Sequence, residues 1–109
     1  MLIHFNEIEN LRREATFGGE GIFDAKIYND GQNRIIMGTL LPGAKIGYHL
    51  HTEGSEMIYI LSGKGKSTYD SEIEELVPGS CQYCPKGHSH DMVNDGTENL
   101  VFFAVVTKE

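Results

Sequence analysis

Turn-forming residues divide this sequence into short segments, and their spacing constrains the fold more than any other feature. Thirteen glycines and three prolines are spread over 109 residues. The segments between them are rich in β-branched and aromatic residues and have the length of β-strands. Strands are expected at residues 21–28, 34–41, 46–51, 56–61, 64–69, 73–77, 80–84, 90–94 and 100–106. Residues 100–106 have the composition of a fully buried strand, and residues 8–15 carry a weak helical pattern. Eight or nine strands with little helix predict an all-β sandwich or barrel.

The composition narrows the class of protein further. The apolar fraction of 39% and the charged fraction of 23% are those of a globular chain, and the length predicts a single domain over residues 1–109. The net charge is −7 and the basic residues are scattered, which disfavours nucleic-acid binding. No apolar run approaches the ~20 residues needed to cross a bilayer, and the first residues lack the pattern of a signal peptide. We therefore expect a cytoplasmic protein that binds neither membranes nor nucleic acids.

Three histidines and one glutamate stand at spacings that suit a metal site. His49 and His51 are two residues apart, so on a strand both side chains project from the same face. Glu56 follows after a turn, and His90 is expected on a neighbouring strand. Imidazoles and a carboxylate are ligands of first-row transition metals, and three neutral imidazoles with one carboxylate leave a divalent ion a charge of about +1. The pattern predicts one divalent ion, which could be Mn, Fe, Zn, Ni, Co or Cu.

Other residues with reactive side chains are interpreted as structural. His88 is expected in a turn at the rim of the site, and Glu53 in an exposed loop. Cys81 and Cys84 lie three residues apart on an expected strand and should point to opposite faces. A redox pair of this spacing normally sits at a helix N-terminus. We therefore expect two reduced thiols packed in or against a sheet.

The spacing of ten residues resembles the paired motifs of the cupin superfamily, in its small single-domain bacterial form. The first motif, G-x5-H-x-H-x3,4-E-x6-G, spans residues 43–63 and is matched by Gly43, His49, His51, Glu56 and Gly63. The second, G-x5-P-x-G-x2-H-x3-N, spans residues 79–94 and is matched by Gly79, Pro85, Gly87, His90 and Asn94. The resemblance implies a small jelly-roll (double-stranded β-helix) barrel. It also implies that the four ligand residues point into the barrel.

The same resemblance carries three smaller expectations. Asn94 is expected to be a structural hydrogen-bonding residue. Ser80 stands where many cupins have Asp, a departure that should affect a turn and leave the site intact. A homodimer is expected, by sheet packing or by exchange of N-terminal strands, with Leu2–Phe5 and Leu100–Val106 as the candidate segments.

The surroundings of the site are expected to be mostly apolar. Strand alternation predicts that Gly47 and Lys45 share the face of His49, and it gives Ile58, Ile60 and Met92 the same orientation. Further candidates for the lining, depending on register, are Met37, Tyr48, Tyr59 and Phe103. Arg34 and Lys45 are the only basic residues expected near the site, which disfavours a phosphosugar isomerase.

Three functions are compatible with these features. The leading hypothesis is a metal-dependent enzyme of the oxygenase or isomerase type that acts on a small organic substrate in the barrel. No separate catalytic acid or base can be assigned from the sequence. The alternative is a non-catalytic, metal-dependent module that binds or stores a small molecule, because fold and ligands alone do not imply catalysis. A metal-stabilised structural domain is the third.

Overall fold

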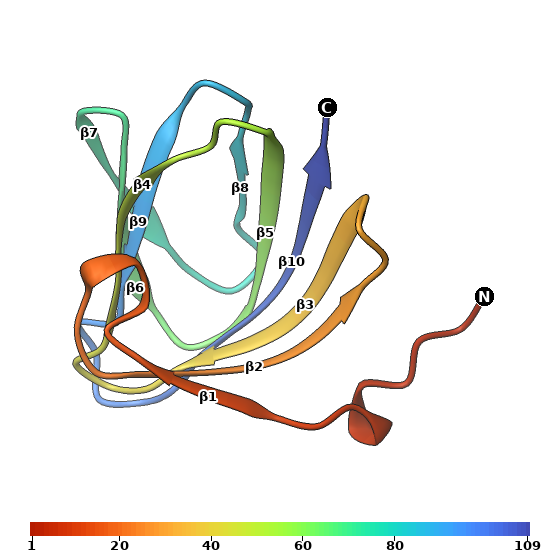
Figure 1. Cartoon of the computed structure of the whole chain (residues 1–109). Helices are drawn as coiled ribbons and strands as arrows, with labels where there is room; N and C mark the ends of the chain where they lie inside the picture. Colours follow the sequence, from red (N-terminus) through yellow and green to blue (C-terminus); the bar gives the residue numbers. More distant parts are fainter.

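Two antiparallel β-sheets face each other in the computed structural model, which describes residues 1–109 (Figure 1). The strand order is β1-β2-β3-β10-β5-β8 in the six-stranded sheet and β4-β9-β6-β7 in the four-stranded sheet. The strands are β1 (Leu11–Glu14), β2 (Ile22–Asn29), β3 (Asn33–Leu40), β4 (Lys45–Leu50), β5 (Gly54–Ser62), β6 (Gly65–Tyr69), β7 (Glu72–Leu76), β8 (Cys81–Cys84), β9 (Ser89–Val93) and β10 (Leu100–Lys108). This is the small jelly-roll barrel expected from the sequence.

The helical content is limited to two 3₁₀ turns, η1 (Phe5–Glu7) and η2 (Thr16–Gly18). None of the helical segments has the length and apolar character needed to span a membrane. The helical expectation for residues 8–15 was wrong, because Leu11–Glu14 form β1 and pair with β2. The Arg12 guanidinium donates two hydrogen bonds of 2.9 Å to Asp24 on β2. These cross-strand contacts outweigh a weak local helical preference. With β1, the structure has ten strands, one more than the nine segments predicted.

Apolar side chains from both sheets form one core between them. Its buried members are Ala25, Ile36, Leu40, Ala44, Ile58, Ile60, Leu76, Met92, Leu100, Phe102 and Ala104. The expectation of a fully buried β10 was wrong. Leu100, Phe102 and Ala104 point inward, whereas Phe103 lies on the outer face, where its ring makes an edge contact with Phe5 at 6.3 Å between centroids. The strand is buried on one face and partly covered by the N-terminal segment on the other.

A β-bulge in β4 changes which side chains face the interior. The register of the β4–β9 pairing shifts between Ile46 and His49. Two residues of β4, Gly47 and Tyr48, therefore lie opposite one residue of β9, Asp91. An extra residue in one strand reverses the alternation of faces beyond it. Ile46 therefore shares the interior with His49, and the expected orientation of Gly47 and Lys45 toward the site was wrong.

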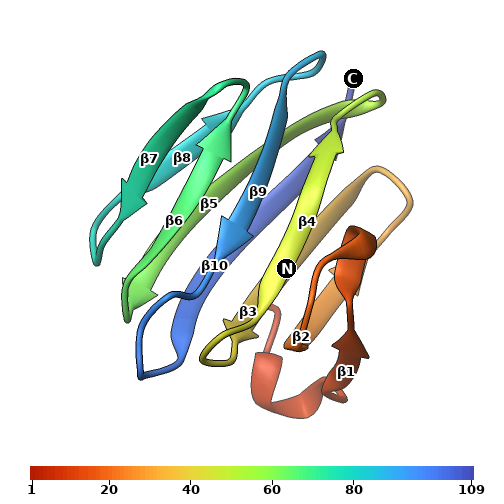
Figure 2. The same cartoon turned by 90° about the vertical axis from the view of Figure 1, so that its left-hand side faces the viewer.

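The turn η2 lies directly against β4 (Figures 1 and 2). A side chain at Gly47 would collide with the carbonyl oxygen of Phe17, and one at Gly19 with the carbonyl oxygen of Lys45. Ala15 and Phe17 have φ angles of 52° and 51°, in the left-handed region that costs a non-glycine residue on the order of 1–3 kcal/mol. The two glycines permit this close approach, and the surrounding contacts hold η2 in a strained conformation.

Candidate metal centre

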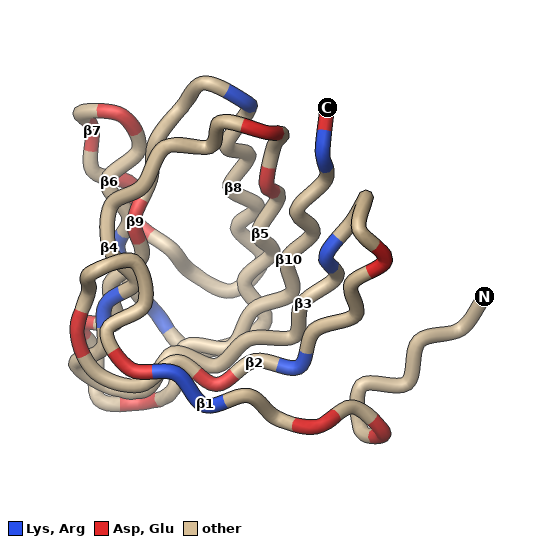
Figure 3. Tube along the Cα trace, viewed as in Figure 1, with Lys and Arg blue, Asp and Glu red and all other residues tan.

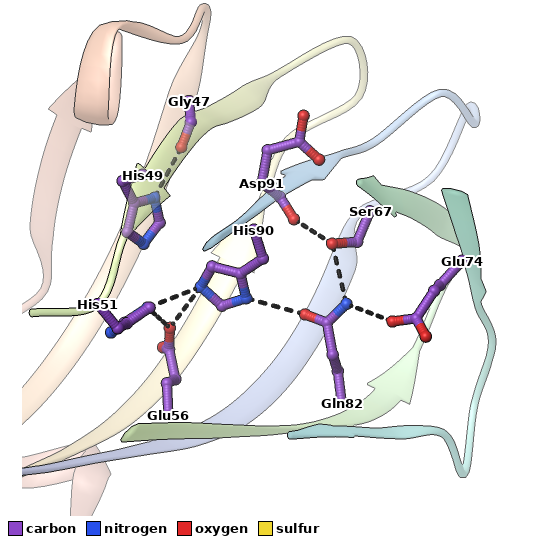
Figure 4. A network of polar contacts seen from close by, with 9 residues as sticks. All are labelled: Gly47, His49, His51, Glu56, Ser67, Glu74, Gln82, His90 and Asp91. Carbon is purple, nitrogen blue, oxygen red and sulfur yellow. Dashed lines mark hydrogen bonds and ion pairs between the residues drawn. The ribbon is translucent and has the colours of Figure 1, made fainter. Parts of the chain in front are cut away.

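The four side chains predicted as metal ligands meet at one point inside the barrel (Figure 4). One ligand atom from each of His49, His51, Glu56 and His90 lies within 4.8 Å of the others. The Nε2 atoms of His51 and His90 are 2.9 Å apart, and Glu56 Oε1 is 3.3 Å and 3.0 Å from them. Pairing of His49 with His90 across β4 and β9 places these two rings side by side. Glu56 faces them from β5, in the opposite sheet.

Hydrogen bonds to backbone and side-chain oxygens orient two of the imidazoles. His49 Nδ1 lies 2.7 Å from the carbonyl oxygen of Gly47, and His90 Nδ1 lies 2.9 Å from Oε1 of Gln82. Both oxygens accept hydrogen bonds, so the ring proton is on Nδ1 in each case. A neutral ring then presents the lone pair of Nε2 to the centre, which is the form that a metal ion binds.

The orientation of Gln82 is itself determined by neighbouring groups. Its side-chain nitrogen donates hydrogen bonds of 2.9 Å to Glu74 Oε1 and 2.9 Å to the hydroxyl oxygen of Ser67 (Figure 4). A carboxylate can only accept, so the amide nitrogen must face Glu74 and the amide oxygen must face His90. Neither Gln82 nor Glu74 was predicted from the sequence to support the site. The alternation of inward and outward side chains along β8 could have indicated Gln82, because it places Gln82 on the inner face together with Cys84.

The electrostatics of the centre favour a bound cation. The side chains of His51, Glu56 and His90 expose at most 12% of their surface. Burial alone would raise the pKa of the Glu56 carboxyl, but hydrogen bonds and charge interactions with the imidazolium forms of His51 and His90, which carry a proton on Nε2 as well as on Nδ1, outweigh it and lower the pKa to about 2. Burial lowers the pKa of His49 despite the hydrogen bond to the Gly47 carbonyl, so this ring is neutral at pH 7. Nitrogen lone pairs and a carboxylate this close together repel unless a proton or a cation lies among them, so the donor set fits a divalent transition-metal ion.

A cavity of about 90 Å³ opens beside these four residues. Its apolar wall comes from both sheets and includes Phe23, Ile27, Ile36, Ile46, Phe102 and Val106. Ile58 and Met92 also line it, as predicted. Tyr48 and Tyr59 do not, because their side chains point outward and are half exposed. Met37 and Phe103 are likewise absent from the cavity wall, since they lie on the outer face of the large sheet.

Two arginines line this cavity, one of which the sequence analysis missed. Arg34 was a candidate; it lies on the same face of β3 as Ile36, and although it is exposed to solvent it lines the cavity. Arg13, on β1, is the second. Neither forms an ion pair with a protein carboxylate, whereas Lys45 lies 3.7 Å from Asp91 and does not line the cavity. Arg13 could not be assigned because residues 8–15 were interpreted as helical.

The turn η2 forms part of the same wall. The ring of Phe17 stacks on the His49 imidazole with 4.0 Å between centroids and 12° between planes. Thr16 also lines the cavity. These contacts tie the N-terminal part of the chain to the candidate metal centre.

Residues interpreted as structural lie outside the four-residue group. His88 Nδ1 is 2.7 Å from the Asp70 carboxylate, and this partly exposed pair links two loops. Cys81 is exposed and Cys84 buried, on opposite faces of β8 and not disulfide-bonded, as predicted. Burial and the nearby charges of Glu56 and Asp70 raise the pKa of the Cys84 thiol to about 11, so it stays protonated.

The expectations for Asn94, Ser80 and Glu53 also agree with the structure. Asn94 donates hydrogen bonds of 2.8 Å to the carbonyl oxygens of Leu40 and Glu98. The Ser80 hydroxyl accepts one from the Val77 amide within a turn, away from the metal centre. Glu53 is exposed, as expected.

Comparison with known proteins identifies the family. The oxalate-binding protein of Thermotoga maritima is 33% identical over an alignment 112 residues long that covers 97% of this chain and 93% of that protein. The crystal structure of a predicted oxalate decarboxylase from the same organism superposes with a TM-score of 0.92 at 26% identity, over the full length of both chains. A Streptococcus pyogenes protein of unknown function gives 0.72 at 26% identity, over 80% of this chain and 75% of that one. The family model for the cupin domain matches residues 36–106, and the chain therefore belongs to the cupin family.

Proposed function

We propose that this cupin binds one divalent transition-metal ion through His49, His51, Glu56 and His90, and that the loaded site binds a small dicarboxylate of the oxalate class. The observation that carries the proposal is the convergence of these four ligand atoms within 4.8 Å beside a small cavity. A divalent ion there would supply positive charge and open coordination positions for carboxylate oxygens. The donor set does not select among Mn, Fe, Zn, Ni, Co and Cu.

The arginines support an anionic ligand. The chain has only three, and its basic residues are scattered among acidic ones (Figure 3). Arg12 is paired with Asp24 on the surface, so the two arginines without a carboxylate partner both line the cavity. Across the sheet, Arg34 pairs with Val106, which pairs with Glu56. Two strand spacings, or roughly 10 Å, therefore separate the Arg34 and Glu56 backbones. A guanidinium binds a carboxylate through two parallel hydrogen bonds.

The size of the cavity and the relative support a small dianion. The cavity beside the four ligands, at about 90 Å³, is well below the roughly 300–1,000 Å³ of pockets for drug-sized ligands, although a wider surface hollow of about 500 Å³ also includes Arg34, His49 and His51. It suits a ligand of a few non-hydrogen atoms. The Thermotoga maritima relative, at 33% identity over nearly the whole chain, is an oxalate-binding protein by name.

The cavity residues favour binding over catalysis. The side chains lining it that could act as an acid or a base are the four proposed ligands and Asp91. The Asp91 carboxylate accepts a hydrogen bond of 2.6 Å from the Thr68 amide and lies near Lys45, so it is held away from a ligand. No free acid or base is left to move a proton during a reaction. Binding is therefore our conclusion, and an oxygenase or isomerase activity stays a prediction.

Titration calorimetry tests the proposal. Protein loaded with Mn²⁺ or Zn²⁺ should bind one oxalate per chain and bind acetate more weakly, and chelator-treated protein should bind neither. Arg34→Gln should lower oxalate affinity about tenfold or more, because it removes charged hydrogen bonds. Arg12→Gln is the matched control and should leave the affinity unchanged. Equal binding with and without metal, or no binding by the loaded protein, contradicts the proposal. Release of CO₂ from oxalate or consumption of O₂ would establish an enzyme instead.

A further inference from the structure

Among the buried side-chain nitrogen and oxygen atoms of the chain, one has no hydrogen-bond partner. It is the hydroxyl oxygen of Thr16, in the turn η2. Buried hydroxyls in folded proteins almost always have a partner, so an exception calls for an explanation. Thr16 lines the same cavity as His49, Glu56 and Arg13. The residue that carries the unpaired hydroxyl therefore belongs to the wall of the proposed ligand site.

The backbone around Thr16 is fixed from both ends. The Ala15 amide donates a 3.1 Å hydrogen bond to the Gly21 carbonyl. Glu20 and Lys45 exchange a pair of backbone hydrogen bonds, at 3.0 and 2.8 Å, that join the end of this segment to β4. The close contact of Phe17 with Gly47 holds the middle. These contacts fix the position of the Thr16 backbone beside the cavity.

The chemistry of the wall indicates what the hydroxyl binds. A threonine hydroxyl can donate to a carboxylate oxygen and thereby gain the partner that it lacks. Arg13, three residues earlier, supplies a positive charge to the same cavity without a protein carboxylate to neutralise it. Both residues precede the stretch 36–106 that matches the cupin domain.

We infer that the Thr16 hydroxyl donates a hydrogen bond to a carboxylate oxygen of the bound ligand, and that residues 13–17 form the wall that selects this ligand. The inference rests on the proposed dicarboxylate function and assigns its selectivity to the N-terminal segment. Thr16 is not a member of the metal-ligand group, so it acts on the affinity for the organic anion and leaves the affinity for the metal unchanged.

Three variants test this role. Thr16→Val removes the hydroxyl at constant shape, Thr16→Ser retains it, and Thr39→Val makes the same change on the outer face of β3. The measurements are oxalate affinity of the Mn²⁺-loaded protein, Mn²⁺ affinity, and melting temperature of the ligand-free protein. Thr16→Val should weaken oxalate binding about 10- to 100-fold, the loss expected for one hydrogen bond to a charged group. Thr16→Ser should bind nearly as the wild type, and Thr39→Val should not differ from it.

The melting temperature separates a binding role from a structural one. Without ligand the hydroxyl has no partner to lose, so Thr16→Val should melt at the same temperature as the wild type or higher. Unchanged oxalate affinity in Thr16→Val, or a lower melting temperature with weaker Mn²⁺ binding, overturns the inference. If wild-type protein binds oxalate and Thr16→Val binds it equally, only this inference fails. If the loaded wild type binds no dicarboxylate, the proposed function fails with it.

Discussion

The contact between His90 and Gln82 gives a quantitative prediction about metal affinity. Gln82→Leu removes the oxygen that holds the proton on His90 Nδ1, at a contact where Gln82 and His90 are 6% and 2% exposed. Loss of a group that orients a metal-bound histidine typically weakens metal binding 10- to 100-fold. We therefore expect a loss of about 1.4–2.7 kcal/mol in the free energy of metal binding.

A second variant tests the same His90–Gln82 contact indirectly, through the residue that orients Gln82. Glu74→Gln leaves His90 untouched but replaces the charged acceptor that fixes the Gln82 amide. A hydrogen bond to a charged group contributes roughly 1.5–3 kcal/mol and a neutral one roughly 0.5–1.5. The change of about 1 kcal/mol predicts a loss of metal affinity of up to about fivefold. Glu75→Gln, one residue later on exposed β7, removes the same charge without this contact.

Competition titration with Zn²⁺ at pH 7 measures the affinities, and nitrogen NMR of the metal-free protein reports which ring nitrogen of His90 carries the proton. The wild type should carry it on Nδ1, and Gln82→Leu should show a mixture of the two forms. Equal Zn²⁺ affinities for Gln82→Leu and wild type would contradict a role of Gln82 in orienting His90. Equal losses in Glu74→Gln and Glu75→Gln would contradict a role of Glu74 in fixing Gln82, since they would reflect charge alone.

Three further predictions follow from the same geometry. Folding lowers the pKa of Glu56 from 4.5 to about 2 in the metal-free protein. The free energy of unfolding should therefore fall by on the order of 3 kcal/mol as the pH is lowered from above 4.5 toward 2. Urea unfolding measures this loss, and its pH dependence should be weaker in Glu56→Gln. Gly47→Ala should lower the melting temperature by several degrees and remove the Phe17–His49 stacking, because its Cβ collides with the Phe17 carbonyl, whereas Gly96→Ala should be tolerated. The expected homodimer stays a prediction: Tyr59, half exposed on the outer face of β5, is a candidate contact, and Tyr59→Asp should shift a dimer to monomer in sedimentation velocity if that face is the interface.

The positions of the candidate ligands could be predicted because strand periodicity determines them. A two-residue spacing places His49 and His51 on one face, and the turn before Glu56 returns the chain within reach. Both inferences need only local rules. The same rules placed Ile58 and Met92 in the cavity and Cys81 and Cys84 on opposite faces of β8.

Features that depend on long-range pairing could not be predicted. The bulge at Gly47 reverses the alternation on β4, and only the pairing with β9 reveals it. Arg13 and Thr16 reach the cavity because β1 pairs with β2 and η2 packs on β4, contacts with no local signature. Glu74 meets Gln82 across the two sheets.

Elemental analysis of the purified protein tests whether His49, His51, Glu56 and His90 hold a metal ion. Untagged protein and its His90→Ala variant would be purified in parallel, checked for equal strand content by circular dichroism, and analysed for transition metals. We expect close to one divalent ion per wild-type chain and a large loss of metal in the variant. Wild-type protein that neither contains nor takes up a transition metal, or a variant that retains the same amount, would contradict the proposed metal site.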